Sequence, residues 1–167
     1  MTPGFLGLGS NVGNRRDHLE AGVRALPRHG IVVRASSSVY ETEPVGPVPD
    51  QGAFLNAVVR IETELDPDAL LVAIKEVERE VGRRSGGVPK GPRELDVDAL
   101  ALAERAERRP RLTLPHPELT RRRFVLVPFL ELEPGFVLPD GTVLSEAAKV
   151  LAGAPGQGVM RHSVPLV

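Results

Sequence analysis

The chain has 167 residues, a formal net charge of −1 and no cysteine. The lack of cysteine excludes disulfides, thiolate metal sites and cysteine nucleophiles, and the near-neutral charge gives no general attraction to nucleic acid or anionic membranes. The length and an apolar content of 41% suit one domain over residues 1–167 with a real core. No basic stretch precedes a long apolar run at the N-terminus, and no apolar run approaches the ~20 residues of a membrane helix. We therefore expect a cytoplasmic protein without a membrane partner.

Apolar patterning gives the order of elements along the chain. Strands are predicted at residues 4–8, 31–40, 54–63 and 95–102. Helices are predicted at residues 15–28, after the cap Asn14, and at 67–81, after Asp66 and with proline at the first helical position. The order β-α-β-β-α-β is the ferredoxin-like pattern, an α+β fold with helices packed on a mostly antiparallel sheet.

Two loops and a C-terminal elaboration complete the predicted organisation. The loops, residues 43–52 and 82–93, are rich in proline and glycine and could close as lids that exclude water. Beyond residue 111, we predict a helical stretch at 124–132, a turn at 139–141 and a last helix at 145–151. The chain has no internal repeat and no low-complexity tract.

Several short motifs resemble known sites but do not fit them. Gly7, Gly9 and Gly13 suggest a dinucleotide fingerprint, but the spacing is one residue too long, so tight-turn glycines are the better interpretation. The P-loop pattern is absent. His116-Pro117-Glu118 resembles the H-x-E of zinc deaminases, whose second element needs cysteines that this chain lacks.

The centre of the functional hypothesis is a pair of aspartates in the fourth predicted strand. Side chains two apart share a face of a strand, so Asp96 and Asp98 point the same way, ~6.6 Å apart along it, while Leu95 and Val97 point into the core. Magnesium prefers one or two carboxylates completed by phosphate oxygens and water. The alternative is a pair of surface salt bridges to nearby arginines. The buried character of the strand favours the metal site.

Arginines surround this pair in the sequence. From residue 79 to 123, eleven Arg and one Lys stand against seven acids, a local excess of five positive charges. Arg83 and Arg84 end the second helix, Arg93 precedes the aspartates, and residues 121–123 are a run of three. Guanidinium groups match phosphate oxygens bidentately, so this arrangement suits a triphosphate whose charge must be neutralised as a bond breaks.

The motifs together resemble the 6-hydroxymethyl-7,8-dihydropterin pyrophosphokinase family. The matching segments lie at residues 9–11, 40–46, 54–57, 78–83, 91–98, 114–117 and 122–128. The most specific are Gly91-Pro92-Arg93-x-x-Asp96-x-Asp98 and, at the correct distance, Leu114-Pro115-His116-Pro117. The similarity runs from about residue 5 to residue 141.

The resemblance implies transfer of the β- and γ-phosphates of ATP to the hydroxymethyl group of the dihydropterin, leaving AMP, in folate synthesis. By similarity, Asp96 and Asp98 hold two magnesium ions, and the catalytic set is Arg83, Arg93, Asp96 and Asp98. The residues implied for ATP binding are Glu78, Arg83, Arg84, Lys90, Arg93, Arg111, Thr113, His116 and Arg122. For Lys90 a phosphate contact and a merely solvated position both remain open.

The resemblance also implies a slot for the pterin. Phe54 and Phe124 would sandwich the ring, Asn56 would bond its edge, and groups around Thr42 and Val45 would complete the slot. A flat heterocycle with several donors and acceptors suits two aromatic faces and one amide. The alternative is that both phenylalanines simply pack in the core.

Rival functions make different predictions. A nucleotidyltransferase would also use paired aspartates and arginines, but it would release pyrophosphate and not AMP. A ferredoxin-like binding module would need neither aspartate, so replacing Asp96 would leave its function intact. A nucleic-acid module is weaker still, because the strands lack a set of stacking aromatics. We expect a monomer that acts on small molecules.

Overall fold

The computed structural model describes residues 1–43, 52–84, 94–103 and 105–167. Its main sheet contains β1 (Thr2–Ser10), β2 (Ile31–Ser36), β3 (Val39–Thr42), β4 (Phe54–Thr63), β5 (Asp96–Leu102) and β8 (Val159–Ser163). The strand order is β5-β1-β4-β3-β8, with β2 also paired to β4, and every pair is antiparallel. This order confirms the predicted ferredoxin-like core, in which β1 and β4 are the central strands.

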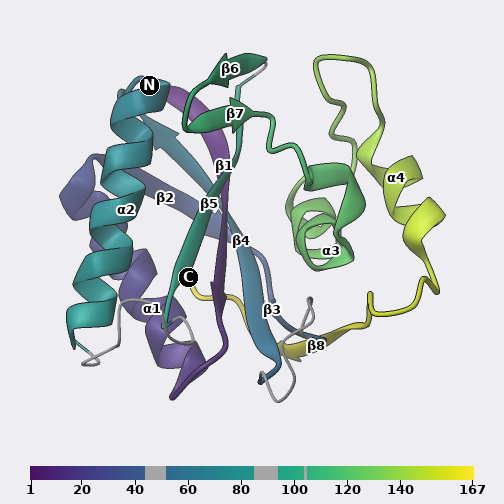
Figure 1. Cartoon of the computed structure of the whole chain (residues 1–167), viewed down its shortest axis with the longest axis horizontal. Coiled ribbons are helices and arrows are strands. Elements are labelled where there is room, and N and C mark those ends of the chain that lie inside the picture. The colour runs from purple at the N-terminus through teal and green to yellow at the C-terminus, as the bar shows by residue number, and fades with distance from the viewer. Residues whose placement is uncertain (44–51, 85–93, 104) are drawn as a thin grey trace.

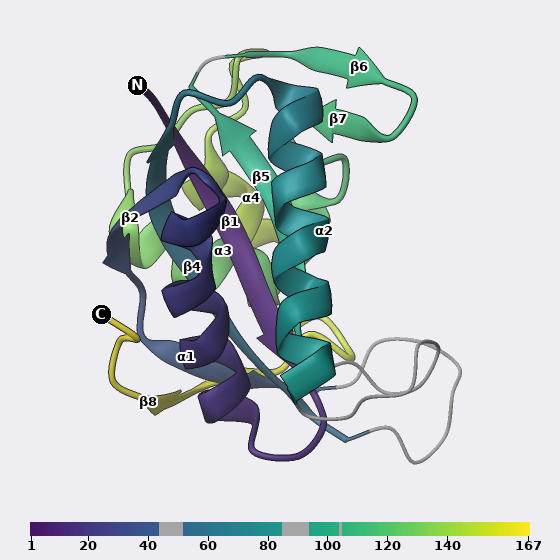
Figure 2. The same ribbon diagram turned by 90° about the vertical axis from the view of Figure 1, so that its left-hand side faces the viewer.

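Helices cover both faces of the sheet. The helices α1 (Arg15–Ala25) and α2 (Pro67–Arg84) lie on one face, and α3 (Arg123–Leu132) and α4 (Leu144–Leu151) lie on the other (Figure 1). Turning the molecule brings α1 and α2 in front of the sheet (Figure 2). A separate hairpin of β6 (Glu107–Arg109) and β7 (Leu112–Leu114) lies near the N-terminal end of α2. No described helix is both long and apolar enough to cross a membrane.

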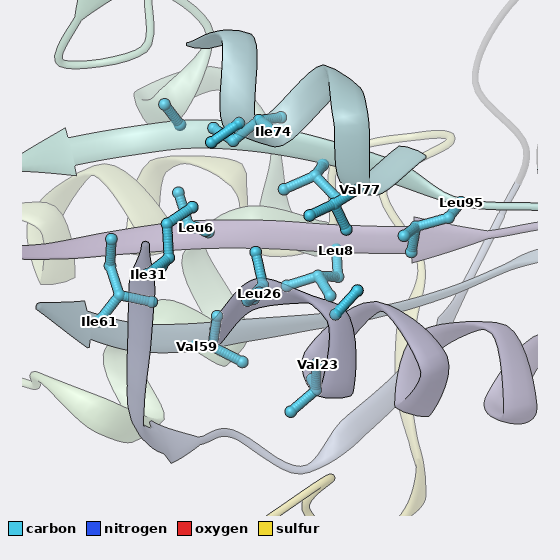
Figure 3. Packing of buried hydrophobic residues seen from close by; sticks show 14 of the residues in the cluster. Leu6, Leu8, Val23, Leu26, Ile31, Val59, Ile61, Ile74, Val77 and Leu95 are labelled. Carbon is cyan, nitrogen blue, oxygen red and sulfur yellow. The ribbon is translucent and has the colours of Figure 1, made fainter. Parts of the chain in front are cut away.

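Each face of the sheet has its own apolar core. Between the sheet and α1–α2, fully buried side chains such as Leu6, Leu8, Ile74 and Val77 interdigitate (Figure 3). On the opposite face, Phe5, Phe129 and Phe136 form an aromatic cluster, with the centroids of the Phe5 and Phe129 rings 4.4 Å apart. β1 serves both cores because its alternate side chains point to opposite faces.

The predicted strand at 31–40 is wrong in one respect, because it is two strands separated at Ser37-Ser38. The hydroxyl of Ser37 accepts a hydrogen bond from the backbone of Val58 and donates one to the carbonyl of Ser38. Serine side chains that bond to nearby backbone compete with a regular ladder. Both strands still pair with β4.

The first predicted helix, 15–28, is also shorter than expected. The α-helix ends at Ala25 and continues as a 3₁₀ turn, Leu26–His29. Pro27 lacks the backbone N–H that an α-helix needs at this point, and Gly30, with φ of +85°, ends the turn. The second helix, in contrast, runs past its predicted end to Arg84. The hairpin β6–β7 and strand β8 were not predicted.

Candidate functional site

The two aspartates lie on β5, which is an edge strand of the sheet. Val97 between them is buried in the core under α1 and α2, whereas Asp96 is half-buried and Asp98 is exposed. The strand alternation therefore places both carboxylates on the opposite face, as predicted. Two residues later β5 contains a bulge, since Leu6 pairs with Ala99 but Phe5 pairs with Ala101.

A cavity of about 210 Å³ opens in front of this strand face. We name it the strand-face cavity. It is lined by Gly7, Leu8, Gly9, Thr42, Glu43, Phe54, Asn56, Ala57, Val58, Asp96, Asp98, Leu100, Arg122, Phe124 and Val125. The structure thus brings both aspartates together with every predicted pterin residue that it describes, from three strands and the start of α3.

The polar floor of the strand-face cavity is an ordered pair of buried side chains. Asn56 donates from Nδ2 to the hydroxyl of Thr42 at 2.8 Å. That bond fixes the amide, so its Oδ1 is on the side of Gly9, where an added Cβ would lie only 2.7 Å from this oxygen. A fixed amide carbonyl beside a hydroxyl group offers an acceptor and a donor to the edge of a flat heterocycle.

Arg122 and Phe124 form the α3 side of the strand-face cavity. Arg122 has an extended backbone, with φ of −125° and ψ of 108°, and its carbonyl accepts the first bonds of α3, from Val125 and Leu126. Its guanidinium carbon lies 5.6 Å from the centre of the Phe124 ring, within the range of a cation–π contact. The guanidinium and the ring therefore lie against each other at this side of the cavity.

A second cavity, of about 390 Å³, lies at the outer edge of β5. We name it the edge cavity. It is lined by Leu71, Lys75, Val97, Asp98, Ala99, Arg109, Pro110, Arg111, Leu112, Thr113, His116 and Pro117. Three residues predicted at the nucleotide, Arg111, Thr113 and His116, are brought together here. Asp98 lines both cavities, so the two sites meet at this carboxylate.

His116 is held in one orientation and one tautomer. Its backbone N–H donates to the carbonyl of Leu100, the extra residue of the β5 bulge, at 2.9 Å. Its Nδ1 accepts from the N–H of Glu118 at 3.0 Å, so a neutral ring carries its proton on Nε2. Burial lowers the pKa of His116, and Arg122 lowers it further, while Asp98 and Glu118 oppose the change. A neutral ring with a donor at Nε2 can bond to a phosphate oxygen.

Glu78 supports the aspartate strand from behind. Its Oε2 accepts from the N–H of Val97 at 2.8 Å, and its Oε1 accepts from Lys75 at 3.0 Å. Glu78, which the resemblance assigns to ATP binding, is not among the described residues that line the edge cavity, whereas Lys75 is. The carboxylate satisfies a backbone donor on the open edge of β5.

Several predicted residues lie where the structure gives no side chain to assess. Val45, Lys90 and Arg93 fall outside the described residues, and Arg83 and Arg84 are described only as the last backbone positions of α2. In contrast, sequence reasoning missed Gly7, Gly9 and Glu43 as lining residues. The interpretation of Gly7 and Gly9 as tight-turn glycines is wrong, because both lie within β1. Of the three glycines in that motif, only Gly13 has a positive φ, of +65°.

The ligands that the two aspartates offer suit the predicted magnesium. Asp96 and Asp98 supply two carboxylates at the wall of a cavity, the number that Mg²⁺ commonly takes from protein when phosphates complete its shell. Among the described residues, no group of three or more potential metal ligands occurs. An all-protein cage is therefore not formed by the described part of the chain, and the two aspartates fit a metal shared with a phosphate substrate.

Comparison with known proteins identifies the family. The family model for 7,8-dihydro-6-hydroxymethylpterin-pyrophosphokinase (HPPK) matches residues 5–134. The chain belongs to the HPPK family. It is 40% identical over 139 residues to the 2-amino-4-hydroxy-6-hydroxymethyldihydropteridine pyrophosphokinase of Aquifex aeolicus, covering 83% of this chain and 85% of that one. The protein of the same name from Pseudomonas aeruginosa is 39% identical, with 94% of each chain covered.

Other similar proteins are much longer than this chain. A folate synthesis bifunctional protein of Arabidopsis thaliana is 42% identical over 76% of this chain, which spans only 26% of that protein. The crystal structure of Plasmodium falciparum HPPK-DHPS with pteroate superposes with a TM-score of 0.71 at 13% identity, covering 89% of this chain and 44% of the other. This structural similarity supports the fold alone.

Proposed function

We propose that this HPPK-family chain transfers the pyrophosphoryl group of ATP to the hydroxymethyl group of 6-hydroxymethyl-7,8-dihydropterin, giving the pterin diphosphate and AMP in folate synthesis. The observation that carries the proposal is the pair of cavities that meet at Asp98. One is lined by two phenylalanines and a buried amide, and the other by arginine, lysine and histidine. The aromatic rings and the amide suit a flat heterocycle, and the positively charged side chains suit a polyphosphate.

The reaction is a displacement at phosphorus. The hydroxymethyl oxygen of the pterin attacks the β-phosphorus, the bond from that phosphorus to the α–β bridging oxygen breaks, and the hydroxyl proton is released. AMP leaves with the bridging oxygen. Catalysis of this kind needs positioning and charge neutralisation and little covalent help from the protein.

On the pterin side, Phe54 and Phe124 hold the faces of the ring, and Asn56 with Thr42 bonds its edge. On the nucleotide side, Arg111, Thr113 and the Nε2–H of His116 contact ATP, and Arg122 reaches the phosphates from the α3 wall. Asp96 and Asp98 would hold two magnesium ions, which neutralise phosphate charge when bound. The assigned roles of Glu78, Arg83, Arg84, Lys90, Arg93 and Val45 complete the proposed site.

The proposal extends to the domain organisation, oligomeric state, location and partners of the protein. Residues 1–167 act as one pyrophosphokinase domain, as a monomer in the cytoplasm, on small molecules and without nucleic acid or membrane partners. Size-exclusion chromatography with light scattering tests the monomer directly. A dimer at micromolar concentration would contradict the proposed monomer but would not affect the proposed reaction.

The deciding experiment follows nucleotide products after the protein is mixed with ATP, magnesium and the dihydropterin. AMP formed one-for-one with pterin diphosphate, and only with all components present, is the expected result. Free pyrophosphate with an adenylylated product would instead indicate a nucleotidyltransferase. Asp98→Asn should lower the rate at least about 10²-fold, because the carboxylate at the meeting point of both sites is lost. Wild-type-like turnover by this variant would contradict the assigned role of Asp98.

A further inference from the structure

One side chain near the C-terminal end of the chain forms hydrogen bonds with the backbone on both sides of Arg122. Gln157, a half-buried residue two positions before β8, accepts at Oε1 from the N–H of Arg123 at 3.0 Å. It donates from Nε2 to the carbonyl of Arg121 at 3.1 Å. Its own carbonyl accepts from the Arg123 guanidinium at 3.0 Å. The peptide groups on both sides of Arg122 are therefore held by one amide.

The pattern of these hydrogen bonds explains the extended backbone conformation of Arg122. In a parallel sheet, one residue bonds to the carbonyl before its partner and to the N–H after it. The amide of Gln157 makes this same pair of bonds around Arg122, whose φ and ψ are in the extended region. The side chain thus replaces a strand partner at the point where the extended chain turns into α3.

The next residue, Gly158, forms a hydrogen bond with the opposite wall of the strand-face cavity. The carbonyl of Gly158 accepts from the N–H of Glu43 at 3.2 Å, and Glu43 follows β3 and lines the cavity. In Figure 1 the yellow segment after α4 runs to β8, which lies beside β3. Two consecutive residues, Gln157 and Gly158, therefore connect the α3 wall to the β3 wall. Both lie outside the segment matched by the family model, residues 5–134.

We propose that Gln157 is a positioning residue for the pyrophosphoryl-transfer reaction. It acts through Arg122: by fixing the peptide groups on either side, it directs the guanidinium and the adjoining Phe124 ring into the strand-face cavity. The inference rests on the proposed function, because it assigns Arg122 and Phe124 to substrates. Small misplacement of a positioning group lowers the rate strongly even where the fold is intact.

The test compares Gln157→Ala with the wild type in kcat and KM for the dihydropterin, measured by AMP formation at saturating MgATP. We expect kcat/KM to fall about tenfold, with a drop in kcat and not in KM alone. Gln157→Glu keeps the acceptor for Arg123 but loses the donor to Arg121, so it should be intermediate. Met160→Ala, on the exposed side of β8, is the matched control and should match the wild type.

A double-mutant cycle separates positioning from general stability. If Gln157 acts through Arg122, Gln157→Ala should change kcat/KM less than about twofold when Arg122 is already alanine. An equal tenfold loss in both backgrounds, or no loss in either, would overturn the proposal. The midpoint of thermal unfolding should stay within about 4 °C of the wild type, because the positioning role leaves the fold intact.

Pterin binding gives a readout that does not need turnover. The fluorescence of the dihydropterin, titrated with protein, should give a weaker Kd for Gln157→Ala than for the wild type, because a misplaced Arg122 guanidinium no longer packs on the Phe124 ring. A wild type that binds pterin without forming AMP would overturn the proposed reaction while this comparison still tests the positioning role. An unchanged Kd together with unchanged rates would remove Gln157 from the site.

Discussion

At the scale of single residues, Gly9 shows how a missing side chain shapes the proposed pterin site. Gly9 pairs with Asn56 across β1 and β4, and a Cβ at this position would lie 2.7 Å from the Asn56 Oδ1. The contact is too close for any real Cβ atom, so the amide would have to turn away from Thr42. Glycine is needed here because of this close approach and not because of its backbone angles.

Gly9→Ala should therefore weaken binding of the dihydropterin about tenfold or more, because the fixed amide is displaced. Titration of the pterin fluorescence measures the change in Kd. Gly135→Ala is the matched control, since an added Cβ there meets nothing within 4 Å. Equal affinities for the wild type and Gly9→Ala would mean that Asn56 does not bond to the ligand.

Tyr40 is the only tyrosine, and the chain has no tryptophan, so its ionisation can be followed without interference. Burial, a hydrogen bond from its hydroxyl to Glu131 and the charge of that carboxylate raise the pKa of Tyr40 to about 12. The raised pKa means that the folded state favours the neutral phenol. The associated stability is complete below pH 10 and is lost as the pH rises to about 12.

The prediction is a phenolate absorbance titration with a midpoint near pH 12 for the folded protein and near 10 in denaturant. Glu131→Gln removes the negative charge but keeps an acceptor, so its midpoint should fall between these values. Coincident folded and denatured titrations would show that the bond from Tyr40 to Glu131 is not formed in solution.

Residue types alone could predict part of this site. Strand alternation singles out Asp96 and Asp98, whereas Asn56 and Phe54 come from the resemblance to a known family. Gly9 did not stand out, because its role depends on which residue of β4 lies opposite, and register comes from pairing across the sheet. Gln157 was missed for a related reason: its partners lie more than thirty positions away.

At the scale of elements, β5 depends on α2 for its position. Glu78 accepts from the N–H of Val97, between the two aspartates. Its side chain is only 14% exposed, whereas that of its ion-pair partner Lys75 is 48% exposed, so the backbone bond matters more than the ion pair. The helix thereby holds the segment that carries both carboxylates.

Glu78→Ala should lower the free energy of unfolding by about 1–2 kcal/mol, because a partly buried N–H loses its acceptor. It should also weaken MgATP binding, measured by calorimetry. Glu78→Gln keeps an acceptor and should recover most of both losses. If the glutamine variant is as impaired as the alanine variant, the charge of Glu78 acts on the nucleotide directly, as the family resemblance implies.

The main elements could be predicted because their apolar periods are long and regular, as in α2, where Leu70, Ile74, Val77 and Val81 share one buried face. The hairpin β6–β7 and strand β8 could not. β6 and β8 are mostly polar or half-exposed, and β7 has only three residues, which is too short to predict a strand from its alternation. β8 exists because β3 offers it a free edge, which only the folded sheet reveals.

At the scale of the whole molecule, the C-terminal elaboration builds the second core and one wall of the site. Phe129 of α3 is fully buried and touches the rings of Phe5 on β1 and Phe136 beyond the helix. α3 also begins at the residues that line the strand-face cavity. The packing of this core therefore holds the α3 wall against the sheet.

Phe129→Ala should destabilise the protein by about 3–5 kcal/mol, the usual loss for a buried aromatic residue replaced by alanine. Urea unfolding measures the change, and pterin affinity should fall in parallel as α3 loosens. Val150→Ala, 83% exposed on α4, is the control and should be neutral. A loss below about 1 kcal/mol for Phe129→Ala would mean that the α3 layer is not firmly packed on the sheet.

The hydrogen bonds at the outer side of β5 have a consequence for the behaviour of the protein at high concentration. An open edge strand is a template on which another chain can add a strand and start aggregation. Here Glu78 occupies the N–H of Val97, and the N–H of His116 occupies the carbonyl of Leu100 at the bulge. The groups that orient the site therefore also protect this edge against intermolecular pairing. Variants that free them should become prone to self-association as well as less active.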